Sequence, residues 1–205
     1  MHIYAFGSVC RGEIDYGSDV DLLAIVDEHD GVFDPNIFSI YSYKRIKELW
    51  KEGNPFAWHL AKEARLLYSL NCDNFIEKLD TPNKYNRTKE DCEKFQRLFS
   101  GALSSIESDS KSLIYDLSTM FLSIRNFATC YALGCLDLCE FSRYSAQRLG
   151  NRSLEISDDS FRILERSRIL STRGYGEIIC KEEVKMVLKE VPVIHNWMNK
   201  LLKEI

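Results

Sequence analysis

The feature that most constrains the fold of this chain is a pair of short Gly/Ser segments between two strand-like apolar runs near its beginning. Residues 3–6 and 20–26 are rich in β-branched and aromatic side chains, and Gly, Ser or Asp bounds each run. Ser8 is placed to cap a short helix after the first run, and Gly12 and Gly17 offer turns before the second. The pattern therefore predicts two strands connected by a short helix and a loop.

Two carboxylates, Asp19 and Asp21, stand two residues apart at the start of the second run. Because side chains alternate along a strand, both carboxylates should point from one face, with their Cα atoms about 6–7 Å apart. Mg²⁺ prefers hard oxygen ligands and commonly takes one or two carboxylates together with substrate phosphates. The pair therefore predicts a Mg²⁺ site with room for two ions, in which both aspartates are metal ligands and catalytic residues.

A phosphate-binding turn is predicted beside this pair. At Gly7 and Ser8 the backbone can approach a phosphate closely, and the amide groups that open the following helix face negative charge. The Ser8 hydroxyl is a further donor, Arg11 lies one helical turn beyond it, and Ser18 directly precedes the carboxylates. These nucleotide-binding candidates, together with the metal, indicate attack on the α-phosphate of a nucleoside triphosphate, with pyrophosphate leaving.

The spacing of these motifs resembles the signature of minimal nucleotidyltransferases of the DNA polymerase β superfamily. Ten residues separate Ser8 from Asp19, and residues 53–68 are similar to the closing helix and strand of that domain. The resemblance covers about the first seventy residues. It implies transfer of a nucleoside monophosphate, with ATP as the favoured donor, to a hydroxyl group of a protein or a small molecule, and it leaves the acceptor unidentified.

The third carboxylate that catalytic members of this family usually carry is not evident. The next expected strand, residues 37–43, has no acidic residue, and the nearest acids are Asp34 and Glu48. Asp27 is excluded because six residues of extended strand put it ~20 Å beyond Asp21. Two interpretations therefore stay open: an active transferase, and a catalytically impaired nucleotide-binding or interaction module similar to an antitoxin.

A histidine downstream, His59, has Glu63 four residues further along the same expected helix. This spacing puts the two side chains on one helical face, where they can form a hydrogen bond. A catalytic base is the alternative role for such a histidine. The sequence favours a packed, hydrogen-bonded helix residue.

The chain is expected to divide into domains at 1–80 and 81–205, because a polar stretch from Thr81 to Asp91 precedes a half with helical periodicity throughout. The predicted fold is an α/β or α+β domain with a small mixed sheet, followed by an all-α helical bundle. Helices are expected over residues 92–107, 111–133, 136–149, 158–170 and 181–204.

The second half resembles a HEPN bundle, a helical domain that often accompanies minimal nucleotidyltransferases, and a homodimer through this half stays open. Ribonuclease members carry Arg and then His on one helix, whereas Arg125 is followed here by Cys130. A thiol has a pKa of about 8.5 against about 6.5 for imidazole, so the ribonuclease alternative is less favoured.

Arg125 is expected either to line a cleft or to pair with a carboxylate. Asp137 and Glu140 are favoured as solvated residues over acceptor-activating ones.

The charge balance argues against a polymeric anion as partner. The chain has 27 Lys and Arg against 31 Asp and Glu, a formal net charge of -4, so nucleic acid is not expected to bind.

No apolar run approaches the ~20 residues of a membrane span, and no signal-peptide pattern begins the chain. The seven cysteines form no Cys-x-x-Cys pair, which is typical of reduced thiols in the cytoplasm. The chain opens directly on a strand-like segment, so a shortened N-terminus stays open.

Overall fold

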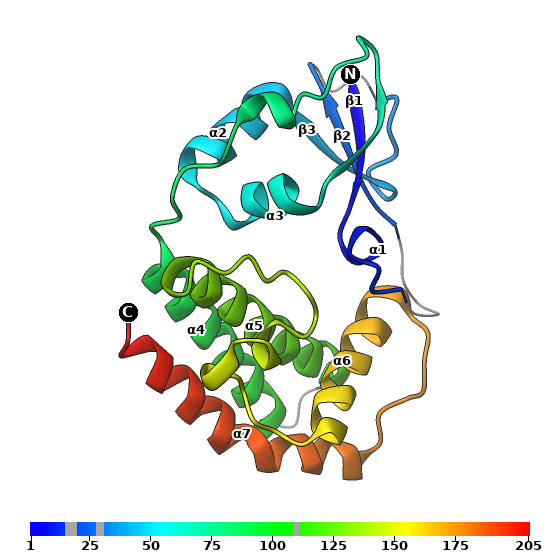
Figure 1. The fold of residues 1–205 in the computed structure, drawn as a ribbon. Helices are drawn as coiled ribbons and strands as arrows, with labels where there is room; N and C mark the ends of the chain where they lie inside the picture. The colour runs from blue at the N-terminus through cyan, green and yellow to red at the C-terminus, as the bar shows by residue number, and fades with distance from the viewer. Residues whose placement is uncertain (15–19, 28–30, 109–110) are drawn as a thin grey trace. The chain divides into compact units, whose positions relative to one another are not determined.

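The computed structural model of the chain describes residues 1–14, 20–27, 31–108 and 111–205 (Figure 1). The chain forms two compact units, Met1–Asn86 and Arg87–Ile205. The first contains a small mixed sheet with helices, and the second contains helices. The predicted fold class is therefore confirmed.

The first unit is built on a four-stranded sheet with the strand order β3-β2-β1-β4. β1 pairs antiparallel with both β2 and β4, whereas β2 and β3 run parallel. The register of β4 slips by one residue, since Ile3 pairs with Tyr68 but Tyr4 pairs with Leu66. This slip leaves Leu67 opposite no residue of β1. The strands are β1 (His2–Phe6), β2 (Asp21–Val26), β3 (Phe38–Ser42) and β4 (Arg65–Ser69).

Two helices of the first unit, α2 (Tyr43–Glu52) and α3 (Pro55–Glu63), begin directly after side chains that cap them. The Ser42 hydroxyl accepts a hydrogen bond from the amide of Arg45 at 3.1 Å and caps α2. The side chain of Asn54 accepts from the amide of Phe56 at 2.9 Å and caps α3, with Pro55 at the first helical position.

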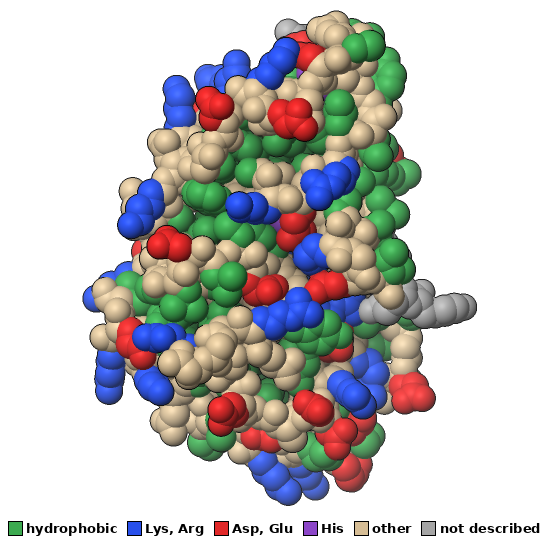
Figure 2. All heavy atoms as spheres, viewed as in Figure 1, with side chains coloured by type: hydrophobic (Ala, Val, Ile, Leu, Met, Phe, Trp, Pro, Cys, Tyr) green, Lys and Arg blue, Asp and Glu red, His purple; other side chains and the backbone are tan. Residues whose placement is uncertain are grey.

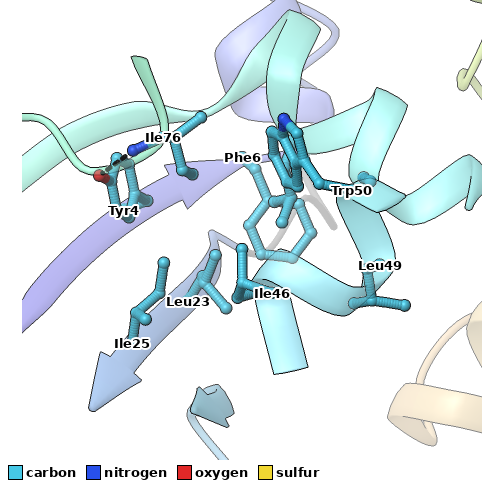
Figure 3. Close-up of a cluster of buried hydrophobic side chains, with 10 residues drawn as sticks. Tyr4, Phe6, Leu23, Ile25, Ile46, Leu49, Trp50 and Ile76 are labelled. Carbon is cyan, nitrogen blue, oxygen red and sulfur yellow. Dashed lines mark hydrogen bonds between the residues drawn. The ribbon is translucent and has the colours of Figure 1, made fainter. Parts of the chain in front are cut away.

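The core of the first unit lies between one face of the sheet and these helices (Figure 3). Alternate strand residues point into it, as expected for a sheet covered on that face. The hydroxyl of Tyr4, at the centre of β1, donates to the Asn74 side chain at 2.9 Å and accepts from the Ile76 amide at 3.1 Å. The segment after β4 is thereby fastened to the core. The buried residues of this core are Tyr4, Phe6, Leu23, Ile25, Ile46, Leu49, Trp50, Ala57, Leu60 and Ile76.

A buried histidine links three parts of the first unit. The Nε2 of His2, in β1, lies 2.9 Å from Oδ1 of Asp73, which follows β4, and its Nδ1 lies 2.6 Å from the hydroxyl of Tyr43 in α2. Asp73 also accepts hydrogen bonds from Lys78 at 2.7 Å and Ser69 at 3.0 Å. Burial raises the pKa of Tyr43 to about 12, so its hydroxyl stays protonated.

The Asp73 cluster makes the stability of the first unit sensitive to acid. Hydrogen bonds from Lys78, His2 and Ser69 hold the pKa of Asp73 well below its usual range. Because the folded-state pKa is lower than the unfolded value of about 4, the stabilisation is complete above that pH and is lost as the pH falls below it. We expect Asp73→Asn to lower the melting temperature at pH 7, and we expect the difference from the wild type to narrow progressively as the pH falls below about 4 towards the folded-state pKa. Parallel melting curves across this range would contradict the assignment.

The second unit is organised around α5 (Leu113–Cys135), most of whose residues are buried. α4 (Thr88–Glu107) approaches α5 closely, since a Cβ on Gly134 would lie 1.8 Å from Oγ1 of Thr88. Phe121 and Phe127 of α5 contact aromatic rings of the remaining helices, α6 (Asp158–Arg173) and α7 (Lys181–Leu202). Within the described ranges, no helix combines the length and apolar character that crossing a membrane requires.

The helix predicted over residues 136–149 is wrong. α5 ends where this segment begins, Asp137 adopts a left-handed φ of 49°, and the described helix inside it is the short 3₁₀ turn Ser145–Gln147. The main-chain oxygen of Phe141 accepts a hydrogen bond from the Arg125 side chain of α5 at 2.8 Å. The apolar periodicity reflects an irregular segment packed against α5, in which side chains bind carbonyl groups that a helix would bind itself.

Candidate functional site

The turn after β1 brings Gly7 against the carboxylate of Asp21. Phe6, the last residue of β1, is the register partner of Asp21, the first residue of β2. Gly7 has φ 80° and ψ -153°, and a Cβ there would lie 2.1 Å from Oδ2 of Asp21. The structure therefore places one predicted metal ligand directly beside the predicted phosphate-binding turn.

The orientation of Asp21 follows from strand alternation, because it shares its face of β2 with the core residues Leu23 and Ile25. Ser18 and Asp19 lie outside the described residues, so their predicted roles stay predictions. Within the part of the chain that the structure describes, no three His, Cys, Asp or Glu side chains form a metal-binding group. Of the predicted carboxylate pair, the structure therefore describes one member, Asp21.

The short helix α1 (Ser8–Arg11) follows the turn. The carbonyl of Gly7 accepts hydrogen bonds from the amides of Cys10 at 3.1 Å and Arg11 at 3.3 Å. The prediction that Ser8 caps this helix is wrong, since Gly7 occupies the N-cap position and Ser8 is the first helical residue. The amides of Ser8 and Val9 precede the first helical hydrogen bond and face outward from the helix start, where a phosphate can accept from them.

Arg11 is paired with two carboxylates. Its Nε donates to Oε2 of Glu13 at 2.9 Å, and its Nη1 donates to Oε2 of Glu63 at 2.5 Å. The same Glu63 oxygen lies 2.8 Å from Nε2 of His59, whose ring packs edge-on against Phe6. The expected packed and hydrogen-bonded His59 is therefore what the structure describes. The contact between Arg11 and Glu63 was not predicted, because 52 positions separate the two residues and no local pattern relates them.

The sequence pattern also did not predict a second cation, Arg65, near the Gly7 turn. Arg65 begins β4 and pairs with Ala5 of β1, two residues before Gly7. Burial raises the pKa of the Cys10 thiol in α1, with Arg65 and Arg11 acting against that shift and Glu63 and Asp21 adding to it. The end of β1 therefore gathers charges of both signs. The sequence gives little indication of this placement, because a basic residue directly before an apolar run is typical of the solvated start of a strand.

The strand next to β2 offers no acid level with Asp21. In the parallel register, Leu22 pairs with Phe38, the first residue of β3, and β3 contains no Asp or Glu. Asp34, one of the two nearest acids, is engaged in the turn into β3: its Oδ1 accepts from the Asn36 amide at 2.8 Å, and its carbonyl accepts from the amides of the two residues that follow Asn36. In the described part of the chain, the third carboxylate of the family pattern has no counterpart on β3.

The remaining acids considered for the site lie at the other end of the strands. Asp27 directly follows Val26, the last residue of β2, and lies six positions after Asp21. Asp27 and Glu48 line one shallow hollow of about 490 Å³, together with lysines of α2. Neither carboxylate is therefore placed to share a metal ion with Asp21.

In the second unit, Arg125 binds main-chain carbonyl groups. It donates to Phe141 at 2.8 Å and to Ser142 at 3.3 Å, and its own carbonyl accepts from the Ser145 hydroxyl. Glu140 accepts from the Ser142 amide at 2.9 Å, which gives its carboxylate a part in the same turn. These bonds give Arg125 a structural part in the 140–145 turn, and its two expected roles, a cleft-lining cation and a partner for a carboxylate, stay predictions.

This arrangement predicts no ribonuclease activity. Cys130 is a buried thiol of α5, and Arg125 supports the 140–145 turn. We expect the purified protein, incubated with RNA in a metal chelator, to cleave no faster than a buffer control, and Cys130→His alone to create no activity. Metal-independent cleavage that Arg125→Ala abolishes would overturn this prediction.

Charged side chains of both signs lie on the face of the molecule drawn in Figure 2. On the face drawn in Figure 2, basic and acidic side chains are interspersed, and no continuous basic groove is visible there. This distribution does not favour binding of a nucleic-acid backbone on that face, because such binding needs a positive patch or stripe.

Comparison with known proteins gives a family match over the first part of the chain. The model of the family described as a nucleotidyltransferase domain matches residues 2–95, which cover the sheet, its helices and the beginning of α4. No curated protein matches the chain. The match supports the nucleotidyltransferase superfamily for the first unit and includes the Gly7 turn and Asp21.

Proposed function

We propose that this protein binds a nucleoside triphosphate with a divalent cation at the turn after β1 and transfers the nucleoside monophosphate to a hydroxyl group. The observation that carries the proposal is the carboxylate of Asp21 packed against Gly7, within a region that matches a nucleotidyltransferase domain. The proposed metal ligand and the proposed phosphate-binding backbone thus lie side by side, and this proximity supports attack on an α-phosphate.

The residues present suit Mg²⁺. Asp21 offers carboxylate oxygens beside a turn whose glycine leaves no side chain in the way, and Asp19 is the proposed second ligand. A bound cation, or two, would supply charge neutralisation for the phosphates and for the oxygens that attack and leave. We expect the side chains of Arg11, Ser8 and Ser18 to contact the phosphates. ATP is the favoured donor, and the acceptor is a protein or a small molecule.

A second candidate function is nucleotide binding without transfer. The strand beside β2, β3, contains no Asp or Glu, so no carboxylate of β3 is placed to take the proton of an acceptor hydroxyl. In this alternative the first unit binds nucleotide as an interaction module. Assembly of two copies through the helical half, and a cytoplasmic location, stay predictions under either function.

Incubation with each triphosphate, labelled at the α-phosphate and supplied with Mg²⁺ or Mn²⁺, distinguishes the two functions. Pyrophosphate release, with label appearing on this protein, on added proteins or on small molecules of a cell extract, is the expected result for the transferase. Nucleotide binding without release of pyrophosphate would favour the second function. Absence of metal-dependent binding for all triphosphates would contradict both.

A further inference from the structure

The two carboxylates that share Arg11 differ in how firmly they are held. Glu63 lies on α3, and its carboxylate is about one-tenth exposed; it contacts both Arg11 and His59 through one oxygen. Glu13 is about one-fifth exposed and lies outside the helices, in the segment that leaves α1. Displacing Glu63 would therefore leave the Arg11 and His59 donors without their carboxylate, whereas the side chain of Glu13 lies closer to solvent.

Arg11 is the cation that the proposed function assigns to the phosphates, yet in the ligand-free protein two of its donors are occupied. A guanidinium group has five N–H donors in a planar fork, and carboxylate and phosphate oxygens bind this fork in the same way. A phosphate group can therefore take the place of one carboxylate while the other stays. The less buried partner is the one that costs less to release.

We propose that Glu63 is a positioning residue that holds Arg11 beside the Gly7 turn, and that Glu13 is the exchangeable partner that a nucleotide phosphate replaces. This inference rests on the proposed function, because it concerns the phosphates of the same triphosphate. It predicts opposite effects for the same chemical change at the two positions. Removing the charge of Glu13 removes a competitor, whereas removing the charge of Glu63 releases the guanidinium from its place.

The test compares Glu13→Gln, Glu63→Gln and the control Glu52→Gln by calorimetric titration with Mn²⁺ and a non-hydrolysable triphosphate. Glu52 is a matched control because it also shares an arginine, Arg45, with a second glutamate, on the exposed face of α2. We expect Glu13→Gln to bind about three- to tenfold more tightly and Glu63→Gln about tenfold or more weakly, since about 1.4 kcal/mol corresponds to tenfold. Glu52→Gln should bind like the wild type.

The direction in which the nucleotide affinity of each variant changes distinguishes the possible roles of Glu13 and Glu63. Tighter binding in both site variants would mean that only local negative charge matters and would overturn the positioning role of Glu63. Weaker binding in both would mean that Glu13 also holds Arg11 and would overturn the exchange. Unchanged binding in both would show that Arg11 does not contact phosphate. A purely structural role for Glu63 would lower the melting temperature of Glu63→Gln without lowering affinity in the folded protein.

Two further measurements keep the inference separable from the proposed function. If Glu63→Gln does not fold, His59→Gln replaces it, because it loosens Glu63 while the ion pair with Arg11 remains; weaker nucleotide binding is expected, and unchanged binding would overturn the positioning role. Metal-dependent binding that Asp21→Asn removes would uphold the proposed function even if the glutamate variants behave alike. A wild-type protein that binds no triphosphate would contradict the function and this inference together.

Discussion

Replacing Asp21 with Asn should lower the metal-dependent affinity for a triphosphate by about 100-fold or more. An amide keeps the shape of the carboxylate but removes the charge that a Mg²⁺ ligand contributes, and a loss of about 3 kcal/mol corresponds to that factor. Titration of a non-hydrolysable triphosphate with Mn²⁺ and without metal measures the effect. Folding should survive, because neutralising one member of the predicted carboxylate pair relieves like-charge repulsion.

The matched control is Asp27→Asn, at the opposite end of β2, which should bind nucleotide like the wild type. The double variant Asp19→Asn with Asp21→Asn extends the test to the ligand that the structure does not describe. If this double variant retains the metal-dependent affinity of the wild type, the assigned site is wrong.

Gly7→Ala is expected to eliminate measurable triphosphate binding and to destabilise the first unit by about 1–3 kcal/mol. A methyl group at this position would lie 2.1 Å from the Asp21 carboxylate, on a backbone whose φ of 80° L-residues rarely adopt. Either the carboxylate or the turn must then move. Gly7→Val should have a larger effect, because a β-branched side chain also restricts the turn.

The chain contains a matched control for this substitution at the other end of α1. Gly12 has a φ of 76°, similar to that of Gly7, but a Cβ there would meet nothing within 4 Å. Gly12→Ala therefore carries the backbone strain without the collision, and we expect a lower melting temperature with nucleotide affinity retained. Equal losses of affinity in the two variants would mean that strain in α1, and not contact with Asp21, explains the effect.

The sequence predicts the turn and its flanking strands because their determinants are local. Glycine, serine and aspartate bound the apolar runs of β1 and β2, and antiparallel pairing of these neighbouring strands then brings Gly7 next to Asp21. The position of Asp19 relative to them stays a prediction. The fold class follows from the same kind of signal, since strand-length runs fill the first half and helical periodicity fills the second.

Contacts between segments that lie far apart in the sequence cannot be predicted from local patterns. Arg11 and Glu63 meet because α3 packs near α1, and no spacing along the chain encodes that approach. The error over residues 136–149 has a related cause, since an irregular segment that buries apolar residues against α5 has the periodicity of a helix. The error at Ser8 is local: Gly7 takes the cap position because its positive φ lets the chain turn one residue earlier.

The slipped register of β4 has a consequence for solubility. β4 is an edge strand, and Leu66, Leu67 and Tyr68 are each more than one-third exposed on it. A regular edge of this composition would be a template for aggregation, because another extended chain could continue its hydrogen-bond ladder. The extra residue at Leu67 interrupts the even spacing of such a ladder. The irregularity therefore allows the protein to keep an apolar strand at its surface with less risk of self-association through this edge.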